Sequence, residues 1–327
     1  MANNDLVVVT DGLTKHFGDF VAVDQFNLEV QAGTVVSLLG PNGAGKTTIV
    51  RMIATLIKPT AGSATVCGYD VVKDSDAVRS VLSLTGQFAA LEDNLTAREN
   101  LILMARLRGY SRKATVQVTE SLIERFDIGE FRDKLVKSVS GGQRRRIDLA
   151  ASLVVQPRVL VLDEPTTGLD PRSRQVVWAT IRELVAEGVT LFLTTQYLEE
   201  ADALADYIVL LDHGRATAAG TANDLKSQVG DQRVDVVAAD AAGLEKLVIG
   251  LSSDFQLKVS AEQRMISIPA PDDVNDLAKV ARAVHDVGVE VDEIALRRPT
   301  LDDAFLALTG QPLSSTDNDN EVEESRS

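Results

Sequence analysis

Residues 40–48 read GPNGAGKTT, and this stretch decides the fold. Gly40, Gly45, Lys46 and Thr47 fit the pattern G-x-x-x-x-G-K-[ST] without a mismatch. The apolar, β-branched run 34–39 before it is typical of a buried parallel strand, and residues 49–56 after it carry apolar side chains at helical spacing. A phosphate loop requires this order of strand, glycine loop and helix, which favours it over a glycine-rich turn that matches by chance.

The residue types in this loop suit a nucleoside triphosphate. Glycines allow backbone N–H groups to turn toward a phosphate, and the N-terminus of the following helix adds partial positive charge. Lys46 brings a full charge to the β- and γ-phosphates, and the Thr47 hydroxyl suits Mg²⁺. We therefore predict ATP and Mg²⁺ as cofactors, bound by Gly40, Pro41, Asn42, Gly43, Ala44, Gly45, Lys46, Thr47 and Thr48.

A second apolar run, 159–162, ends in two acids, Asp163 and Glu164. A carboxylate at the C-terminal end of such a strand lies beside the phosphate loop, where Asp163 can hold Mg²⁺ through a water or through Thr47. Glu164 then stands where a hydrolytic water would be, and we predict that it is the general base. A solvated loop is the alternative, and it would be preferred if the chain had no phosphate loop.

Residues 140–143, Ser-Gly-Gly-Gln, precede a predicted helix over 144–154. Ser140 is a good N-cap, and two glycines leave backbone donors unobstructed. The chain thus carries a second helix start that suits a phosphate. Taken alone, such a cap is commonplace and would be merely structural.

Together these motifs resemble the nucleotide-binding domains of ABC proteins over roughly residues 6–225. The resemblance implies that Gln87 touches Mg²⁺ and the helical subdomain, that residues 168–170 form the D-loop, and that Phe17 stacks on adenine; a core contact is the alternative for Phe17. It also implies a head-to-tail pair with a second ATP-binding subunit. No motif here is degenerate enough to require a different second chain, so we predict a homodimer, with a heterodimer as the alternative. In that pair the γ-phosphate held by one chain meets the opposite helix start, formed by Ser140, Gly141, Gly142 and Gln143.

Position 196 departs from that family, which usually has a switch histidine after the strand corresponding to 191–194. The Gln196 amide can donate to a γ-phosphate or orient water, but it carries no titratable charge near pH 7. We predict that Gln196 is a catalytic γ-phosphate sensor and that hydrolysis lacks a histidine-derived pH step. The alternative is a spectator residue in a slow site.

Three further segments narrow the resemblance: TTGLDPRSRQVVW at 166–178, TTQYLEEAD at 194–202 and RPTLDDAFLAL at 298–308. They are similar to the daunorubicin-resistance type of ABC ATP-binding subunit. That type implies an ATPase that powers efflux of a hydrophobic drug or lipid, and so antibiotic resistance. It would work through separate permease subunits at the cytoplasmic face of the cell membrane. Rival functions are an importer ATPase, a non-transporter ABC ATPase and a regulatory nucleotide sensor without hydrolysis, the last disfavoured by intact Lys46, Asp163 and Glu164.

Composition restricts the partners. A net charge of -15 disfavours nucleic acid and anionic bilayers, which attract clustered Lys and Arg. Cys67 is the only cysteine, so no intrachain disulfide can form. We expect neither a signal peptide in the first residues nor a membrane span, since no stretch approaches the required apolar length. One phosphate loop and a short 97–136 region also disfavour the non-transporter ABC classes.

The order of patterns along the 327 residues predicts an α/β fold. Residues 5–230 would form a P-loop ABC nucleotide-binding domain, with an antiparallel β-subdomain (strands 5–9 and 20–30) and a helical subdomain at about 88–138. Further strands are predicted at 65–69, 81–85, 159–162, 189–194 and 207–212, with helices at 172–187 and 198–205. Residues 231–310 would form a small α+β accessory domain with strands 234–238, 256–260 and 265–269 and helices 241–251 and 273–287, and residues 311–327 an acidic, disordered tail.

Overall fold

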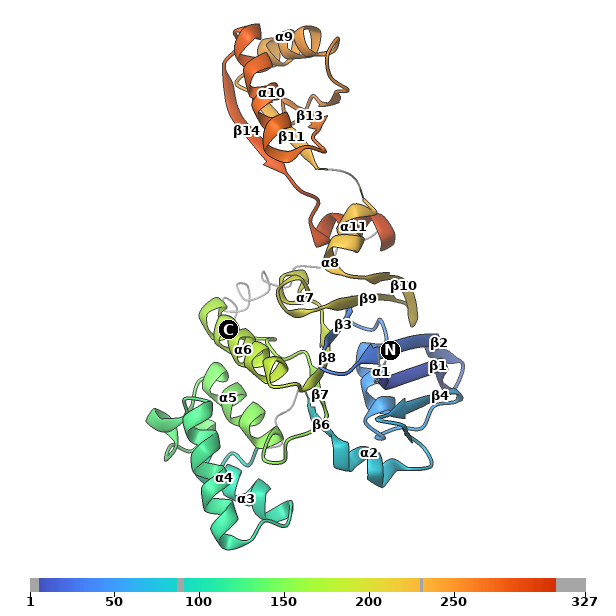
Figure 1. The fold of residues 1–327 in the computed structure, drawn as a ribbon, viewed down its shortest axis with the longest axis vertical. Helices are drawn as coiled ribbons and strands as arrows, with labels where there is room; N and C mark the ends of the chain where they lie inside the picture. The colour runs from blue at the N-terminus through green and yellow to red at the C-terminus, as the bar shows by residue number, and fades with distance from the viewer. Residues whose placement is uncertain (1–5, 87–90, 230–231, 310–327) are drawn as a thin grey trace, which may run out of the picture. The chain divides into compact units, whose positions relative to one another are not determined.

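The computed structural model describes residues 6–86, 91–229 and 232–309 of the chain. They form two compact units, one reaching from the N-terminal strand to Ala222 and the other from Asn223 to Ala307 (Figure 1). The predicted disordered tail, 311–327, lies outside the described residues. The predicted α/β fold is confirmed, because each unit combines helices with β-sheet.

The first unit is built on a six-stranded sheet in the order β10-β9-β3-β8-β7-β6. Its strands are β3 (Val35–Leu39), β6 (Leu82–Thr85), β7 (Val159–Asp163), β8 (Thr190–Thr195), β9 (Tyr207–Asp212) and β10 (Arg215–Gly220). All neighbours pair in parallel except β9 and β10, which form an antiparallel hairpin. Every residue of β3, β7 and β8 is buried, as expected for strands covered on both faces. The loop after β3 therefore leaves the middle of the sheet at its carboxyl edge, where open α/β sheets bind ligands.

A second, antiparallel sheet has the order β2-β1-β4-β5. Its strands are β1 (Leu6–Phe17), β2 (Phe20–Gln31), β4 (Ala61–Val66) and β5 (Tyr69–Asp70). Helix α1 (Lys46–Ile53) buries Ile49 and Met52 in a core shared by this sheet and by Val161 and Phe192 of the larger one. This core holds the helix that follows the phosphate loop.

Two predicted strands of this region are partly wrong. The strand predicted over 65–69 is broken at Cys67 and Gly68, whose φ angles of 50° and 84° turn the chain between β4 and β5. The strand predicted over 81–85 begins one residue later, because Val81 ends helix α2 (Ser75–Val81). Strand β1 also runs beyond the predicted 5–9 and ends at Phe17.

Between Ala97 and β7 the chain is mostly helical, as predicted for 97–136. It contains α3 (Ala97–Leu107), α4 (Arg112–Arg125), two short 3₁₀ turns (Gly129–Phe131 and Val136–Ser138) and α5 (Gly141–Ser152). Thr96 and Ser111 cap α3 and α4 by accepting backbone N–H groups. Leu101, Ile123 and Ile147 share one core with Leu160 and Leu162, the residues of β7 that face away from α1. Helices α6 (Pro171–Ala186) and α7 (Leu198–Leu204) complete the unit.

The second unit follows the order β-α-β-β-α-β. It comprises β11 (Arg233–Ala238), α9 (Ala241–Leu251), β12 (Lys258–Ser260), β13 (Met265–Pro269), α10 (Asp273–Val287) and β14 (Val291–Arg297), with α8 (Ala222–Ser227) before it and α11 (Leu301–Thr309) after it in the sequence. Its strands pair antiparallel in the order β12-β13-β11-β14, which is the split β-α-β arrangement of ferredoxin-like domains. Helices α9 and α10 pack on the same core as Val234, Val236 and Ile266. The sequence did not predict β14.

Candidate functional site

The loop between β3 and α1 requires glycine at two positions, Gly40 and Gly45. A Cβ atom on Gly40 would lie 2.3 Å from the carbonyl oxygen of Leu211, and one on Gly45 would lie 2.6 Å from that of Ala22. Gly43 and Gly45 also have positive φ angles, 84° and 101°. Gly45 caps α1 without a side-chain hydrogen bond, so the first-turn N–H groups are left to an external acceptor. This backbone cradle fits the phosphates of a nucleotide.

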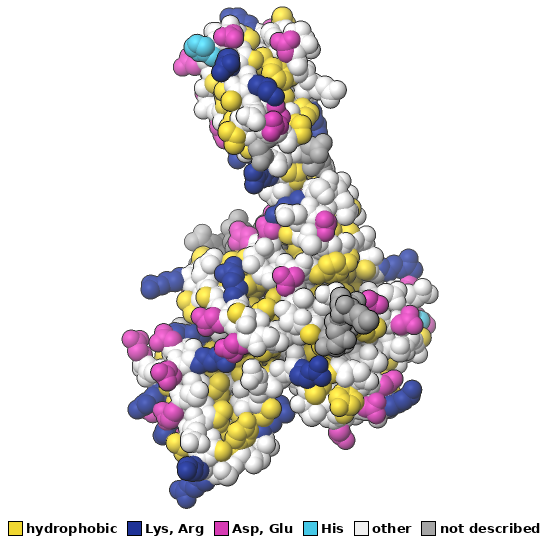
Figure 2. Space-filling view, viewed as in Figure 1, with side chains coloured by type: hydrophobic (Ala, Val, Ile, Leu, Met, Phe, Trp, Pro, Cys, Tyr) yellow, Lys and Arg dark blue, Asp and Glu magenta, His cyan; other side chains and the backbone are white. Residues whose placement is uncertain are grey.

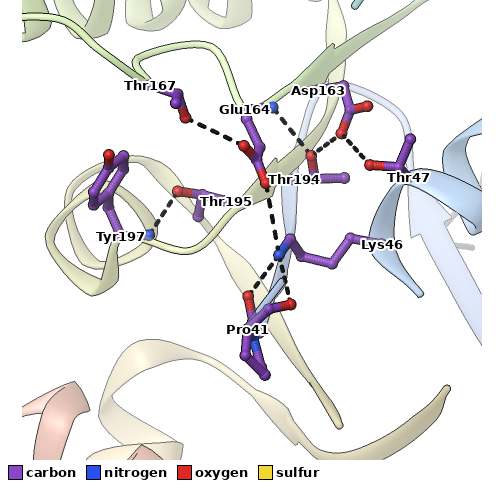
Figure 3. Close-up of polar contacts among 10 residues, drawn as sticks. Pro41, Lys46, Thr47, Asp163, Glu164, Thr167, Thr194, Thr195 and Tyr197 are labelled. Carbon is purple, nitrogen blue, oxygen red and sulfur yellow. Dashed lines mark hydrogen bonds and ion pairs between the residues drawn. The ribbon is translucent and has the colours of Figure 1, made fainter. Parts of the chain in front are cut away.

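Lys46 lies across this cradle and is only 4% exposed. Its Nζ donates to the carbonyl oxygens of Gly40 and Pro41, at 2.6 and 3.0 Å, and lies 3.7 Å from Oε1 of Glu164 (Figure 3). Burial lowers the pKa of Lys46, while the neighbouring carboxylates of Glu164 and Asp163 oppose that shift. The predicted phosphate ligand and the predicted base therefore face each other at the same place.

Asp163, the last residue of β7, contacts Thr47 in the first turn of α1. Thr47 Oγ1 donates to Oδ1 of Asp163 at 3.3 Å, and Thr194 Oγ1 donates to the same oxygen (Figure 3). Such a set of hydroxyl and carboxylate oxygens fits Mg²⁺, which prefers hard oxygen ligands. The sequence reasoning missed Thr194, although its place next to Asp163 follows from the pairing of β8 with β7.

Glu164 stands on a sharp turn directly after β7. Its φ angle of 49° lies in the left-handed region that residues with a Cβ rarely adopt. Two acceptors on Thr194, the carbonyl oxygen and Oγ1, hold the Glu164 N–H at 3.1 Å, and Thr167 Oγ1 donates to Oε2 at 3.3 Å. These bonds direct the carboxylate toward Lys46 (Figure 3).

Ser140 caps α5 in a reciprocal arrangement with Gln143. Ser140 Oγ accepts from the Gln143 N–H at 3.2 Å, and Gln143 Oε1 accepts from the Ser140 N–H at 3.1 Å. Gly142 packs against Ser173 at the start of α6, since a Cβ there would lie 2.5 Å from Ser173 Oγ. Gly142 thus has a packing role that the sequence did not show. Gly141 and Glu164 also line one pocket of about 240 Å³.

Phe17 and Gln196 take different positions around the loop. Phe17 is 51% exposed and lines a pocket of about 230 Å³ with Lys46, Thr47 and Glu164, so the alternative of a core contact is wrong. Gln196, half-buried, directly follows Thr195, whose carbonyl oxygen accepts the Gly40 N–H at 3.3 Å. Position 196 therefore lies at the same sheet edge as the phosphate loop. Gln87 lies outside the described residues.

A buried acid, Glu200, connects the segments that carry Glu164 and Gln196. It has no exposed surface, and its Oε1 accepts from Thr166 Oγ1 at 2.8 Å and from Trp178 Nε1 at 3.0 Å. Burial raises the pKa of Glu200. The sequence did not indicate a role for this residue, because acidic side chains in a segment such as Leu-Glu-Glu-Ala are normally expected to be exposed to solvent.

Helix α5 carries a buried ion pair, and its arginine also bonds to the residue directly after β6. Nη1 of Arg145 donates to Oδ2 of Asp148 at 2.9 Å and to the Gly86 carbonyl oxygen at 3.3 Å. Burial raises the pKa of Asp148 to about 6, although Arg145 opposes this, and burial also lowers the pKa of Arg145. Helix α5, which Ser140 caps, is thus tied to Gly86, the residue that precedes Gln87.

Comparisons with known proteins agree with this geometry. A family model described as ABC transporter matches residues 23–167. Daunorubicin resistance ATP-binding protein DrrA3 of Streptomyces coeruleorubidus is 48% identical, over 94% of this chain and 96% of that protein. Nod factor export ATP-binding protein I of Rhizobium etli is 36% identical over 92% of each. A solved ATP-binding subunit of an ABC transporter superposes with a TM-score of 0.61 at 26% identity, over 68% of this chain and 92% of that one.

No helix among the described residues is long and apolar enough to cross a membrane. The match to DrrA3 covers almost the whole length of both proteins. This chain contains the phosphate loop, the acid pair and the second helix start together. The chain therefore belongs to the ABC transporter family, as an ATP-binding and ATP-hydrolysing subunit.

Proposed function

We propose that this chain powers the efflux of a hydrophobic drug or lipid through separate permease subunits, and so contributes to antibiotic resistance. The similarity to a daunorubicin resistance protein over nearly the whole chain supports a drug cargo. The similarity to a Nod factor export protein supports export in a wider sense and disfavours the importer. Attachment to the permease would place the chain at the cytoplasmic face of the cell membrane.

The single observation that carries the catalytic part is the meeting of Lys46, Glu164 and the Thr47–Asp163 pair. Lys46, a cation for phosphate, forms an ion pair with Glu164, a carboxylate for water. The adjacent residues Thr47 and Asp163 form a second contact, which offers two oxygens to a metal. Phosphoryl transfer needs little else from the protein, because its catalysis is mostly positioning and charge stabilisation.

Each residue then has one role. Lys46 and the N–H groups of the loop bind the phosphates, and the exposed ring of Phe17 stacks on the base. Thr47, Asp163 and Gln87 would hold Mg²⁺, which would neutralise charge on the phosphates. Glu164 accepts the proton of the attacking water. Gln196, with its amide, donates to the γ-phosphate.

The chain works as a pair with a second, identical ATP-binding subunit. Residues Ser140 to Gln143 of one chain approach the γ-phosphate bound by the other, so that two ATP molecules join the pair and hydrolysis releases it. A ligand can drive such a closure only by binding the closed state better. Residues 5–230 form the nucleotide-binding domain, the helical subdomain at about 88–138 passes the change to the permease, and 231–310 is an accessory domain.

Transport into inside-out vesicles tests this proposal. Vesicles containing the permease subunits and this chain receive ATP and a fluorescent anthracycline, and the parent is compared with Glu164→Gln. We expect ATP-driven accumulation that is lost in Glu164→Gln, with ATP affinity kept and the hydrolysis rate lowered by about 10²–10⁴. Lys46→Ala should instead weaken ATP binding, and the exposed Glu245→Gln serves as the matched control without effect.

The possible outcomes separate the parts of the proposal. Parental hydrolysis in purified Glu164→Gln would contradict the assignment of the base. Good hydrolysis without accumulation of the anthracycline would contradict the drug cargo while leaving the ATPase intact, and would direct the search to lipids.

A further inference from the structure

The second unit has one long sheet edge, formed by β14. Among the described residues, β14 pairs with β11 on one side, and no other strand pairs with its second side (Figure 1). The opposite edge, β12, is only three residues long, whereas β14 has seven. An edge strand presents a row of N–H and C=O groups that can pair with another chain. The edge along β14 therefore has the length that such pairing needs.

The charges along this edge have opposite signs on the two sides of Ala295, so the edge is complementary to a second copy of itself. Residues 292–298 read Asp-Glu-Ile-Ala-Leu-Arg-Arg, with two acids before the apolar centre and two arginines after it. If two copies pair antiparallel about a two-fold axis at Ala295, Glu293 of each copy faces Arg297 of the other. Asp292 then faces Arg298, and Ile294 faces Leu296. Every charged position meets its opposite, and every apolar position meets an apolar one.

The pair of Glu293 and Arg297 is arranged so that its exchange between two chains costs little, whereas Asp292 would first have to leave Arg264, to which it is paired at 3.3 Å. Glu293 Oε1 and Arg297 Nη2 form a pair within the chain at 2.7 Å, with both side chains about half exposed. Exposed pairs of this kind contribute little to stability, so the same pair can form between chains instead. Opposite charges across neighbouring strands are favourable, whereas an edge of one sign would repel its own copy.

The apolar residues of this edge support the same arrangement. Ile294 and Leu296 pack against the core beneath α9 and α10 and remain partly exposed. Because side chains alternate along a strand, Glu293, Ala295 and Arg297 lie on the other face of the sheet. Pairing would bring Ile294 of one copy beside Leu296 of the other and extend the apolar layer across the junction.

We propose that β14 is a homotypic interaction surface, and that two copies of this chain join their second units by antiparallel pairing of β14. The two four-stranded sheets become one continuous sheet with a two-fold axis at Ala295. Such an isologous contact closes after two copies. No residue of the phosphate loop takes part, so this contact forms without ATP, unlike the ATP-bridged pair proposed above.

Engineered cysteines in the full chain test the register directly. In a Cys67→Ser, Lys46→Ala background, which removes the native thiol and the ATP-bridged contact, Ala295→Cys places two thiols across the axis. Directly opposite residues in antiparallel strands have Cα atoms about 4.5–5.5 Å apart, which lies within the range of disulfides. We expect mild oxidation without nucleotide to convert most of the protein into a disulfide-linked dimer. Val259→Cys on β12, 46% exposed, is the matched control and should remain monomeric.

Charge reversal tests the pairing chemistry. Adding Glu293→Arg to the Ala295→Cys chain makes both symmetric pairs repulsive, so the rate of cross-linking should fall about tenfold or more. Adding Arg297→Glu as well restores opposite charges and should restore the rate, which a variant that merely misfolds would not show. The proposal is overturned if Ala295→Cys cross-links no faster than Val259→Cys, or if the double reversal stays as slow as the single one.

Discussion

Replacing Glu200 by alanine tests the buried network beneath the site. The change removes two hydrogen bonds, at 2.8 and 3.0 Å, and leaves the Thr166 hydroxyl and the Trp178 N–H without their acceptor. Each orphaned buried donor costs about 1–3 kcal/mol, which gives about 4 kcal/mol for the two. Removing a carboxyl group whose pKa is raised by burial offsets part of this loss. We expect the free energy of unfolding of the first unit to fall by about 3 kcal/mol.

Trp178 provides the assay, because it is the only tryptophan of the chain and lies in the first unit. Urea unfolding followed by its fluorescence should show a midpoint lowered by about 1 M for Glu200→Ala. Glu200→Gln keeps a carbonyl acceptor for both donors and should stay within about 1 kcal/mol of the parent. The neighbouring Glu199→Ala is the control, since that side chain is 82% exposed. A midpoint for Glu200→Ala equal to that of Glu199→Ala would refute the reasoning.

Two further predictions concern titration and turnover. The pKa of Asp148 is raised to about 6, so the folded chain holds this proton more tightly than the unfolded one, and the resulting stability is lost as pH rises through 6. The stability of the parent relative to Asp148→Asn should therefore fall by about 1–2 kcal/mol between about pH 5 and 7.5, measured by urea unfolding, and a constant difference would contradict it. Gln196→Ala should slow hydrolysis by about 10–100-fold, and Gln196→His should add a pH step near the imidazole pKa of about 6.5; an unchanged rate in Gln196→Ala would remove the sensor role.

The buried strands of the first unit could be predicted because their sequences have only one good environment. The apolar runs before Gly40 and Asp163 are too hydrophobic for a solvated sheet face, and the structure buries both strands on both sides. The break at Cys67 could not be predicted, since a positive φ angle at a non-glycine residue has no reliable sequence signal. Strand β14 was not predicted, because its apolar centre is short and is flanked by charged residues, so the segment lacks a clear strand pattern.

The residues of the candidate site also fall into those that the sequence predicted and those that it did not. Lys46, Thr47 and Asp163 were found because phosphate and metal binding require these residue types at a fixed spacing from a glycine loop. Thr194 and Glu200 were missed, because their roles arise from neighbours distant in sequence, Asp163 for one and Trp178 for the other. A sequence pattern within a single helix or strand cannot reveal contacts between residues that belong to different elements. Tertiary packing decides them.

The order of strands in the larger sheet has a consequence for synthesis on the ribosome. Strand β3, which leads into the phosphate loop, pairs with β8 and β9, and these strands emerge only after most of the first unit has been made. A nascent chain that ends before Tyr207 lacks the second neighbour of β3 and leaves the backbone N–H and C=O groups along that edge of β3 unpaired. Such long-range pairing forms late and exposes intermediates to aggregation. The growing polypeptide thus gains its nucleotide site, and any protection that ATP gives, only once residue 212 has left the exit tunnel.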